Sequence, residues 1–340
     1  MKSERECLLE PVTSDAIQRK NIVNFIVNFE DEKHDVNFWQ KRTAMWWEDN
    51  PFYDENLPRG WILKAQEGIV GFLGVIVTDY LYGDKRYKAL NITTWRVLKE
   101  YRNQSMRLFH RFYSYKDRHI LFNTTSDNKA VQRIFQAFGF KANTKISNFI
   151  FPIRCNLSLN ISNIALFFLQ RLYSLLLPRA DCRAISGGGG VKLIKMPDKY
   201  KKFLIKNKDG NYLSWYSSSP LSKKIVGYFN DNNELSSFVT IEEAMARFKS
   251  LRIIDYFIGD DSGKEILSII NYICNNPCII SNAYNYRFLI LSIFSGNEIT
   301  IKRPFFIPNK KSHAKHYYSL PEELKDARIL NYLAEGDVAM

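Results

Sequence analysis

Metal-binding and disulfide-forming patterns are scarce in this sequence. Its five cysteines are an odd number, and only five histidines accompany them. No pair has Cys-x-x-Cys spacing, and Cys274 and Cys278 have Pro277 between them and no histidine nearby. Because structural metal sites need several closely spaced Cys or His ligands, no metal site is predicted. The cysteine usage instead favours reduced thiols in a cytoplasmic protein.

Long hydrophobic runs and leader-like segments are also lacking. The first seven residues are mostly charged, so no secretory signal is expected. The most apolar stretch, 161–177, would span only about 25 Å as a helix and has Gln170 and Arg171 near its middle, which disfavours a transmembrane segment. We expect a buried connecting helix there. The alternative is peripheral contact of 161–177 with a membrane surface.

Acidic residues are outnumbered by basic ones. The chain has 48 Lys and Arg against 35 Asp and Glu, a net charge of +13, and the excess is spread over both halves. Such a charge suits an anionic ligand or surface. The densest lysine run, from Lys192 to Lys208, is typical of solvated surface. No zinc-finger or RNP motif accompanies it, so no specific nucleic acid is expected as a partner.

The most informative segment, 90–140, alternates strands and helices in close order. Residues 90–97 have the pattern of a strand, 99–107 of a turn and a helix start, and 119–125 of a second strand. In 128–140 the apolar residues recur at helical spacing before a Gly-Phe pair. A turn between a strand and a helix presents unpaired backbone N–H groups and the positive end of the helix dipole. It therefore suits a phosphate group.

Residues 97–107, Val-Leu-Lys-Glu-Tyr-Arg-Asn-Gln-Ser-Met-Arg, resemble the phosphate-loop motif of the GNAT superfamily of N-acetyltransferases. Segment 128–140 is similar to the Asn-x-x-Ala-x-x-x-Tyr-x-x-x-Gly-Phe ending of that family, and 61–77 resembles its central hairpin. The resemblance implies an α/β (α+β) fold and acetyl-CoA, or another acyl-CoA, as co-substrate. The residues that it implies for CoA binding are Val97, Leu98, Arg102, Asn103, Gln104, Ser105, Met106, Arg107, Asn128 and Phe135.

The chain departs from the family pattern at two functional places. Ser105 and Arg107 replace small glycines, and their side chains narrow a phosphate cradle. One interpretation points Arg107 outward as an additional phosphate contact, and the other is a fold that no longer binds CoA. Phe135 stands where many family members have a Tyr that protonates the leaving thiolate. That role then falls to water or a neighbouring group, or the domain is not an enzyme.

Candidates for the remaining chemistry follow from the same resemblance. Glu100, at the end of the strand, and Asp79, past the preceding strand, are the candidate general bases. For Glu100 the alternative is stabilisation of a helix N-terminus. Backbone N–H groups near Val97 and Leu98 are expected to polarise the thioester carbonyl. An acceptor pocket is expected to be lined by Trp46, Trp47, Asn50 and Phe52, with core packing as the alternative for the tryptophans.

The second half of the chain repeats the first in outline. Residues 212–220 echo 43–51 with the same Trp-to-Pro spacing, and strands follow at 224–229, 234–241 and 251–258. A helix at 263–274 and a strand at 278–283 complete the series, while the acidic segment 259–265 cannot hold a pyrophosphate. At 340 residues the chain is also too long for one domain of about 150 residues.

These patterns predict two tandem GNAT-like domains, each with a mixed, mostly antiparallel central sheet flanked by helices. The first domain would cover 1–153, the connecting helix and Gly-rich link 154–190, and a second, degenerate domain 191–340. The implied function is an acyl-CoA-dependent N-acyltransferase acting on a small amine, such as an amino sugar of surface-polysaccharide biosynthesis. The alternatives are a FemAB-like aminoacyl transferase with a tRNA partner, and a non-catalytic binding protein.

Overall fold

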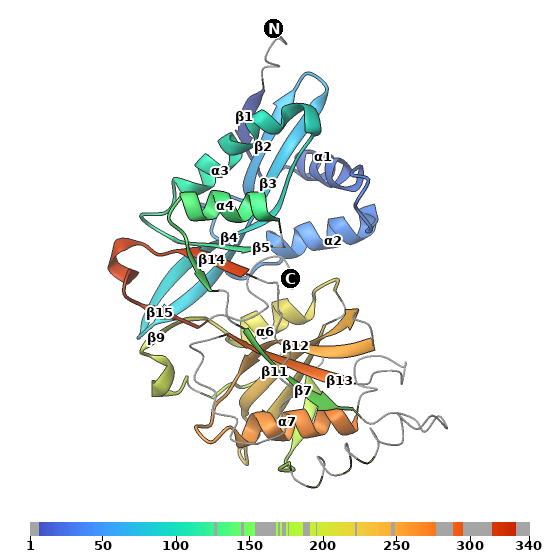
Figure 1. Ribbon diagram of the computed structural model, residues 1–340, viewed down its shortest axis with the longest axis vertical. Coiled ribbons are helices and arrows are strands. Elements are labelled where there is room, and N and C mark those ends of the chain that lie inside the picture. The colour runs from blue at the N-terminus through green and yellow to red at the C-terminus, as the bar shows by residue number, and fades with distance from the viewer. Residues whose placement is uncertain are drawn as a thin grey trace.

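The structure, a computed structural model, consists of two sheets with helices on their faces (Figure 1). It describes residues 7–125, 128–143, 146–153, 168, 171, 175, 177–185, 191–194, 196–221, 223–245, 249–276, 288–294 and 315–330. Both sheets are mixed and mostly antiparallel. The predicted fold class is therefore confirmed.

Nine strands of the described residues form the first sheet. Its main path, in spatial order, is β1 (Leu8–Pro11), β2 (Gly60–Ala65), β3 (Gly68–Tyr82), β4 (Lys85–Val97), β5 (Ile120–Thr125), β14 (Lys315–Ser319) and β6 (Lys141–Asn143). Within this path only β4 and β5 run parallel. Strand β9 (Phe203–Lys206) pairs with the far end of β3 and with β15 (Arg328–Ile329).

The second sheet repeats this arrangement. Its spatial order is β7 (Ile146–Pro152), β13 (Phe288–Phe294), β12 (Lys249–Phe257), β11 (Leu235–Met245), β10 (Lys224–Phe229) and β8 (Cys182–Ile185). Here β12 and β13 form the parallel pair. The series β10-β11-β12-β13-β7 therefore has the same order and directions as β2-β3-β4-β5-β14 in the first sheet.

The two sheets exchange strands. Strand β14, from near the end of the described chain, lies between β5 and β6 of the first sheet, and β7 pairs with β13 of the second (Figure 1, red and green strands). The predicted domain division 1–153, 154–190 and 191–340 thus separates strands from the sheets that they complete. That division stays a prediction.

Helices cover both faces of the first sheet. Helices α1 (Ala16–Val27) and α2 (Val36–Trp46) contact β3 on one face, and their N-caps, Asp15 and Asp35, accept backbone N–H bonds of the first turn. Helices α3 (Ser105–Tyr113) and α4 (Lys129–Ala137) pack on the opposite face, in the core that contains Leu90 and Leu121. We call these the α1/α2 face and the α3/α4 face.

One continuous core joins the two halves. Helix α6 (Gly210–Ser217) lies between the sheets, and α7 (Lys264–Asn275) packs against β8, β10 and β11 of the second sheet (Figure 1). The indole Nε1 of Trp215 donates to the Met45 carbonyl at 2.7 Å, and the Trp215 ring meets Phe52 edge to face at 5.9 Å. Aromatic burial of this kind fixes the sheets relative to each other.

Two predicted segments fall largely outside the described residues. The connecting helix 161–177 is described only at 168, 171, 175 and 177, and the predicted strand 278–283 is not described at all. The strand that pairs in parallel with β12 is β13, at 288–294. As far as the chain is described, every helix is too short or too polar to span a bilayer.

Candidate functional site

The first sheet is open at a fork between β4 and β5. The two parallel strands pair only from Ala89 to Asn91 and from Ile120 to Phe122. Beyond these pairs β4 continues to Val97 and β5 to Thr125, and no strand of the described residues pairs with their facing edges. Unpaired backbone N–H and C=O groups inside a sheet need partners, so this fork is a place for an extended ligand.

A β-bulge reshapes β4 just beyond the fork. Thr93 pairs with Gly74 and Arg96 with Phe72, so Thr94 and Trp95 together oppose a single residue of β3. The backbone of Thr94 has φ +47°, which is uncommon for a residue other than glycine. Gly74 is required opposite the bulge because a Cβ there would come within 2.8 Å of the Thr93 methyl group. The bulge bends the strand and changes the direction of its edge.

Two buried asparagines lie where the strands part. Asn91, the last paired residue of β4, is 0% exposed, and its Oδ1 has no hydrogen-bond partner among the described residues. Asn123, directly after the last paired residue of β5, is 6% exposed, and within the same described part of the chain its Nδ2 has none. Sequence reasoning missed both side chains. The available signal was a polar residue directly after an apolar segment, Ala89-Leu90 in β4 and Ile120-Leu121-Phe122 in β5.

The turn after β4 is helical rather than a glycine-type cradle. Residues Lys99–Gln104 form a 3₁₀ helix, η1, which continues into α3, and the Ser105 amide donates to the Arg102 carbonyl. Intrahelical bonds thus occupy amides that were expected to hold a diphosphate. The first two amides of η1, those of Lys99 and Glu100, have no intrahelical partner. The predicted anion site at 103–107 stays a prediction.

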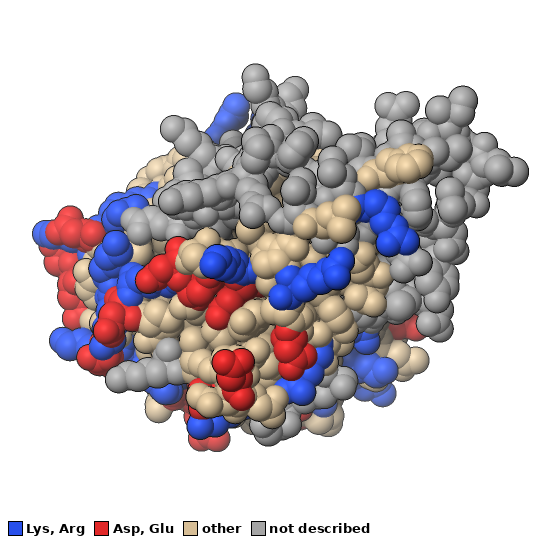
Figure 2. Space-filling model, turned by 90° about the horizontal axis from the view of Figure 1, so that it is seen from below, with Lys and Arg blue, Asp and Glu red and all other residues tan. Residues whose placement is uncertain are grey.

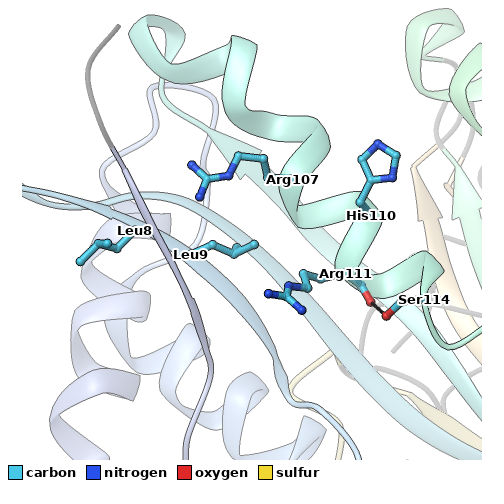
Figure 3. A pocket seen from close by; sticks show the side chains of 6 residues that line it. All are labelled: Leu8, Leu9, Arg107, His110, Arg111 and Ser114. Atoms are coloured by element: carbon cyan, nitrogen blue, oxygen red, sulfur yellow. Dashed lines mark hydrogen bonds between the residues drawn. The ribbon is translucent and has the colours of Figure 1, made fainter.

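Arg107 does not enter the fork. Its Nη1 donates to the Cys7 carbonyl at 2.9 Å and to Gln104 Oε1 at 3.0 Å. Figure 3 shows Arg107 and Arg111 directed into a groove of about 640 Å³ between α3 and β1, which Leu8 and other β1 and α3 residues line. Arg107 therefore leaves the fork clear, and it points toward β1 instead of the turn.

The two candidate bases are far apart. Glu100 is exposed in the first turn of η1, as expected for stabilisation of a helix start. Asp79 is buried in β3 beside Lys88, whose Nζ lies 2.9 Å from Asp79 Oδ1. Gly71 opposes Val97, and Asp79 is eight residues further along β3. At about 3.3 Å per residue, Asp79 lies about 26 Å along β3 from Gly71, which is opposite the end of β4. Glu100 follows that end of β4, so Glu100 and Asp79 cannot share one site.

Helix α4 contributes packing and a cap. Asn128 is its N-cap, with Oδ1 accepting from the amides of Ala130 and Val131. Phe135 is fully buried, and its ring lies 4.8 Å from Phe140 and 5.6 Å from Tyr317 of β14. The structure gives both residues structural roles, while their predicted contacts with CoA stay predictions.

The predicted acceptor pocket coincides with the core. Trp46, Trp47, Asn50 and Phe52 are all buried. Trp47 Nε1 donates to the Val75 carbonyl, and the Asn50 amide bonds the carbonyls of Trp46 and Val77 and the amide of Phe52. These side chains pack α2 and the following turn onto β3. A direct role in acceptor binding stays a prediction.

A buried polar cluster lies between the sheets. Lys208 forms an ion pair with Asp255 of β12 and donates to the Tyr256 carbonyl at 2.9 Å, and the Tyr212 hydroxyl donates to Asp255 Oδ2 at 2.7 Å. Lys206 is 1% exposed and Lys208 4% exposed. The interpretation of this lysine run as solvated surface is therefore wrong at its end. Sequence alone offers little sign of it, because lysines are rarely buried.

The parallel pair of the second sheet parts in the same way, because β12 continues to Phe257 and β13 to Phe294 beyond the pair Ile253–Leu291. The Lys208–Asp255 pair lies two residues beyond Ile253 on β12. Asp260 Oδ2 accepts from the Lys264 amide at the start of α7, where the sequence has its acidic turn. Figure 2, which views the second sheet's end of the molecule, shows acidic and basic side chains mixed over its described surface. The assignment of this half as a degenerate second copy stays a prediction.

Comparisons with known proteins identify the fold. No protein-family model matches the chain, and no curated protein matches it significantly. Among solved structures, a probable N-acyltransferase from Enterococcus faecalis has a TM-score of 0.58 at 8% identity, with 92% of this chain and 72% of that chain covered. A GCN5-related N-acetyltransferase from Kribbella flavida has 0.58 at 10%, covering 92% and 71%. One from Anabaena variabilis has 0.53 at 13%, covering 92% and 72%.

Proposed function

We propose that this chain, which has the fold of the GCN5-related N-acetyltransferases, transfers an acyl group from an acyl-CoA to the amino group of a small acceptor. The observation that carries the proposal is the fork between β4 and β5. The pantetheine arm of CoA is extended and carries amide groups, so it can bond to both open edges. The buried Oδ1 of Asn91 and Nδ2 of Asn123 at the fork, which have no hydrogen-bond partner among the described residues, fit such a ligand as well.

The turn after β4 suits the anionic end of the same ligand. The amides of Lys99 and Glu100 open the 3₁₀ helix, and the exposed side chains of Lys99 and Arg102 add positive charge beside them. We therefore assign the diphosphate to the start of η1. Asn103 to Ser105 would contribute through side chains rather than amides, whereas the Arg107 side chain is directed toward β1.

Acyl transfer needs a polarised carbonyl and a neutral amine held against it, and a thioester supplies the activated carbonyl. The Leu98 amide donates to the Val70 carbonyl of β3 at 2.9 Å, so it is not available. Because successive amides point in opposite directions along a strand, the Val97 amide is directed to the open edge. We assign carbonyl polarisation to Val97. Phe135 carries no transferable proton, so we assign the proton exchanges to water.

The proposed acyl group is acetyl, and the proposed acceptor is a small amine such as an amino sugar of surface-polysaccharide biosynthesis. We place the acceptor between two copies of the fold. The equal strand order of the two sheets supports this tandem arrangement.

Calorimetry with acetyl-CoA tests the proposal, with a pair of charge reversals as a matched comparison. Arg102→Glu removes the positive charge beside the fork, whereas Arg111→Glu makes the same exposed change in the groove near β1. We expect Arg102→Glu to weaken acetyl-CoA binding about tenfold, which corresponds to about 1.4 kcal/mol, and Arg111→Glu to change it less than about twofold. Equal effects of the two variants, or no binding at millimolar acetyl-CoA, would refute the proposal.

A thiol-release assay with pooled amines then tests transfer itself. Release of free CoA that depends on an amine supports an acyltransferase. Binding of acetyl-CoA without release by any amine identifies the non-catalytic alternative. Binding of tRNA with a steep dependence on salt, in the absence of acetyl-CoA binding, identifies the aminoacyl transferase alternative.

A further inference from the structure

Strand β1 lies at one end of the first sheet and has an open backbone edge. It pairs with β2 on one side, and no other strand of the described residues pairs with it. The Val12 amide donates to the Gly60 carbonyl of β2 at 2.9 Å. Because backbone groups of alternate residues point to the same side of a strand, those of Cys7, Leu9 and Pro11 point away from β2.

Leu9 is the residue of this edge that offers both a donor and an acceptor. The Cys7 carbonyl accepts from Arg107 at 2.9 Å, and the Pro11 carbonyl accepts from Gln18 Nε2 at 3.4 Å. Pro11 also has no N–H to donate. Pairing at this edge is therefore limited to a short strand that lies opposite Leu9.

A basic groove separates this edge from α3 (Figure 3). It has a volume of about 640 Å³, and Arg107 and Arg111 point into it from successive turns of the helix. Neither arginine forms an ion pair with an acidic group in the described part of the chain. An acidic ligand would supply the charge that the groove lacks. The described lining has no acidic residue and consists of Leu8, Leu9, Arg107, His110, Arg111 and Ser114.

The two faces of β1 differ in chemistry. The Leu9 side chain packs against the core of the α3/α4 face, whereas Leu8, which points to the opposite face, is 65% exposed. A strand added beside β1 would direct alternate side chains to α3 and the others to the side of Leu8. Arg107 and Arg111 lie about 6 Å apart along the helix, and side chains two residues apart on a strand lie about 7 Å apart. Acidic residues at alternate positions therefore match both guanidinium groups.

We propose that the groove between β1 and α3 binds an extended acidic peptide segment, which adds to the sheet beside β1. Its backbone bonds to Leu9, its acidic side chains meet Arg107 and Arg111, and the apolar side chains between them contact Leu8. The recognised pattern is acidic and apolar residues in alternation. A second copy of this chain is a poorer occupant, because its own arginines would face those of the first copy. This binding is separate from the proposed acyl transfer, since the groove does not include the fork.

Fluorescence anisotropy with synthetic peptides tests the assignment. The probe is a labelled Gly-Glu-Val-Glu-Val-Glu-Gly peptide. One comparison peptide has Gln in place of each Glu, and another has the same composition in the order Gly-Glu-Glu-Glu-Val-Val-Gly. We expect each comparison peptide to bind at least about tenfold more weakly than the probe. N-methylation of the probe backbone should weaken binding at alternate residues, whose amides face β1, and not at the residues between them.

Protein variants locate the binding in the groove. Arg111→Glu should weaken binding of the probe at least about tenfold, whereas Arg102→Glu, the same change at an exposed arginine outside the groove, should change it less than about twofold. Leu8→Ser should weaken it about threefold. Its matched control is Ile17→Ser on α1, because Ile17 is 70% exposed and lies outside the groove lining.

Four outcomes would overturn the assignment: no binding at millimolar probe, equal binding of the Gln peptide, equal binding of the reordered peptide, or equal effects of Arg111→Glu and Arg102→Glu. A wild-type dimer in sedimentation velocity that Arg111→Glu alters would identify a second copy as the occupant and would also overturn it. Acetyl-CoA binding is measured on the same samples. Loss of peptide binding with normal acetyl-CoA binding removes this assignment alone, and the reverse result removes the proposed function alone.

Discussion

His316 should make the fold sensitive to acid in a way that one substitution can isolate. This side chain lies on β14, completely buried. Burial, and secondarily the positive charge of Lys206, lower the pKa of His316 from its ordinary 6.5 to about 3. The folded protein therefore keeps a neutral imidazole at pH values where the unfolded chain binds a proton.

The sign and size of the effect follow from linkage. Because the folded pKa lies below the unfolded one, the free energy of unfolding is highest above pH 6.5 and falls as the pH drops toward 3. Each pH unit in this window is worth about 1.4 kcal/mol, so the full window is worth up to about 5 kcal/mol. Between about pH 7 and about pH 4.5, His316 alone should lower the free energy of unfolding by about 3 kcal/mol.

Urea unfolding followed by tryptophan fluorescence measures this difference in the wild type and in His316→Gln. Other groups titrate in both proteins, so the comparison isolates the imidazole. The wild type should lose about 3 kcal/mol more than the variant between the two pH values. An equal loss in both proteins would show that His316 gains its proton in the folded state near the ordinary pKa.

Two further predictions concern the core. Lys208→Met should lower the free energy of unfolding by about 3–5 kcal/mol in urea titrations because it leaves Asp255 buried without its cation, and adding Asp255→Leu should recover most of the loss. A single variant within about 1 kcal/mol of the wild type would contradict this role. Gly60→Ala should lower the melting temperature more than Gly83→Ala, since both glycines have positive φ but only at Gly60 would a Cβ lie 2.3 Å from the Leu73 carbonyl oxygen. Equal shifts in differential scanning calorimetry would argue against the clash.

Local pattern was sufficient for most individual elements. The strand predicted at 224–229 is β10 at those residues, and the helices predicted at 128–140 and 263–274 are α4 and α7 with ends moved by one to three residues. Pairing between distant segments was not predictable in the same way. Nothing in Lys-His-Tyr-Tyr-Ser at 315–319 indicates that this strand joins β5, because strand pairing depends on tertiary packing rather than on local propensity.

For the site, the resemblance indicated a region of the chain rather than its unpaired polar groups. It indicated the end of β4 and the start of α3, where the fork and η1 lie. With Ser105 and Arg107 in place of glycines, the turn is helical, and bonds within the helix use the amides of 102–105. The role of His316 depends on burial, and that of Asn91 on burial and an unmet hydrogen bond among the described residues, which become visible only once the strands are assembled.

The insertion of β14 between β5 and β6 has a consequence for biosynthesis. While the chain grows on a ribosome, β5 lacks its outer neighbour until residues 315–319 emerge, long after β5 itself. Prematurely terminated products would keep an unpaired strand edge and expose the ring of Phe135 that Tyr317 otherwise covers. Such products are substrates for proteases and chaperones, so only a chain translated past β14 can form the complete first sheet.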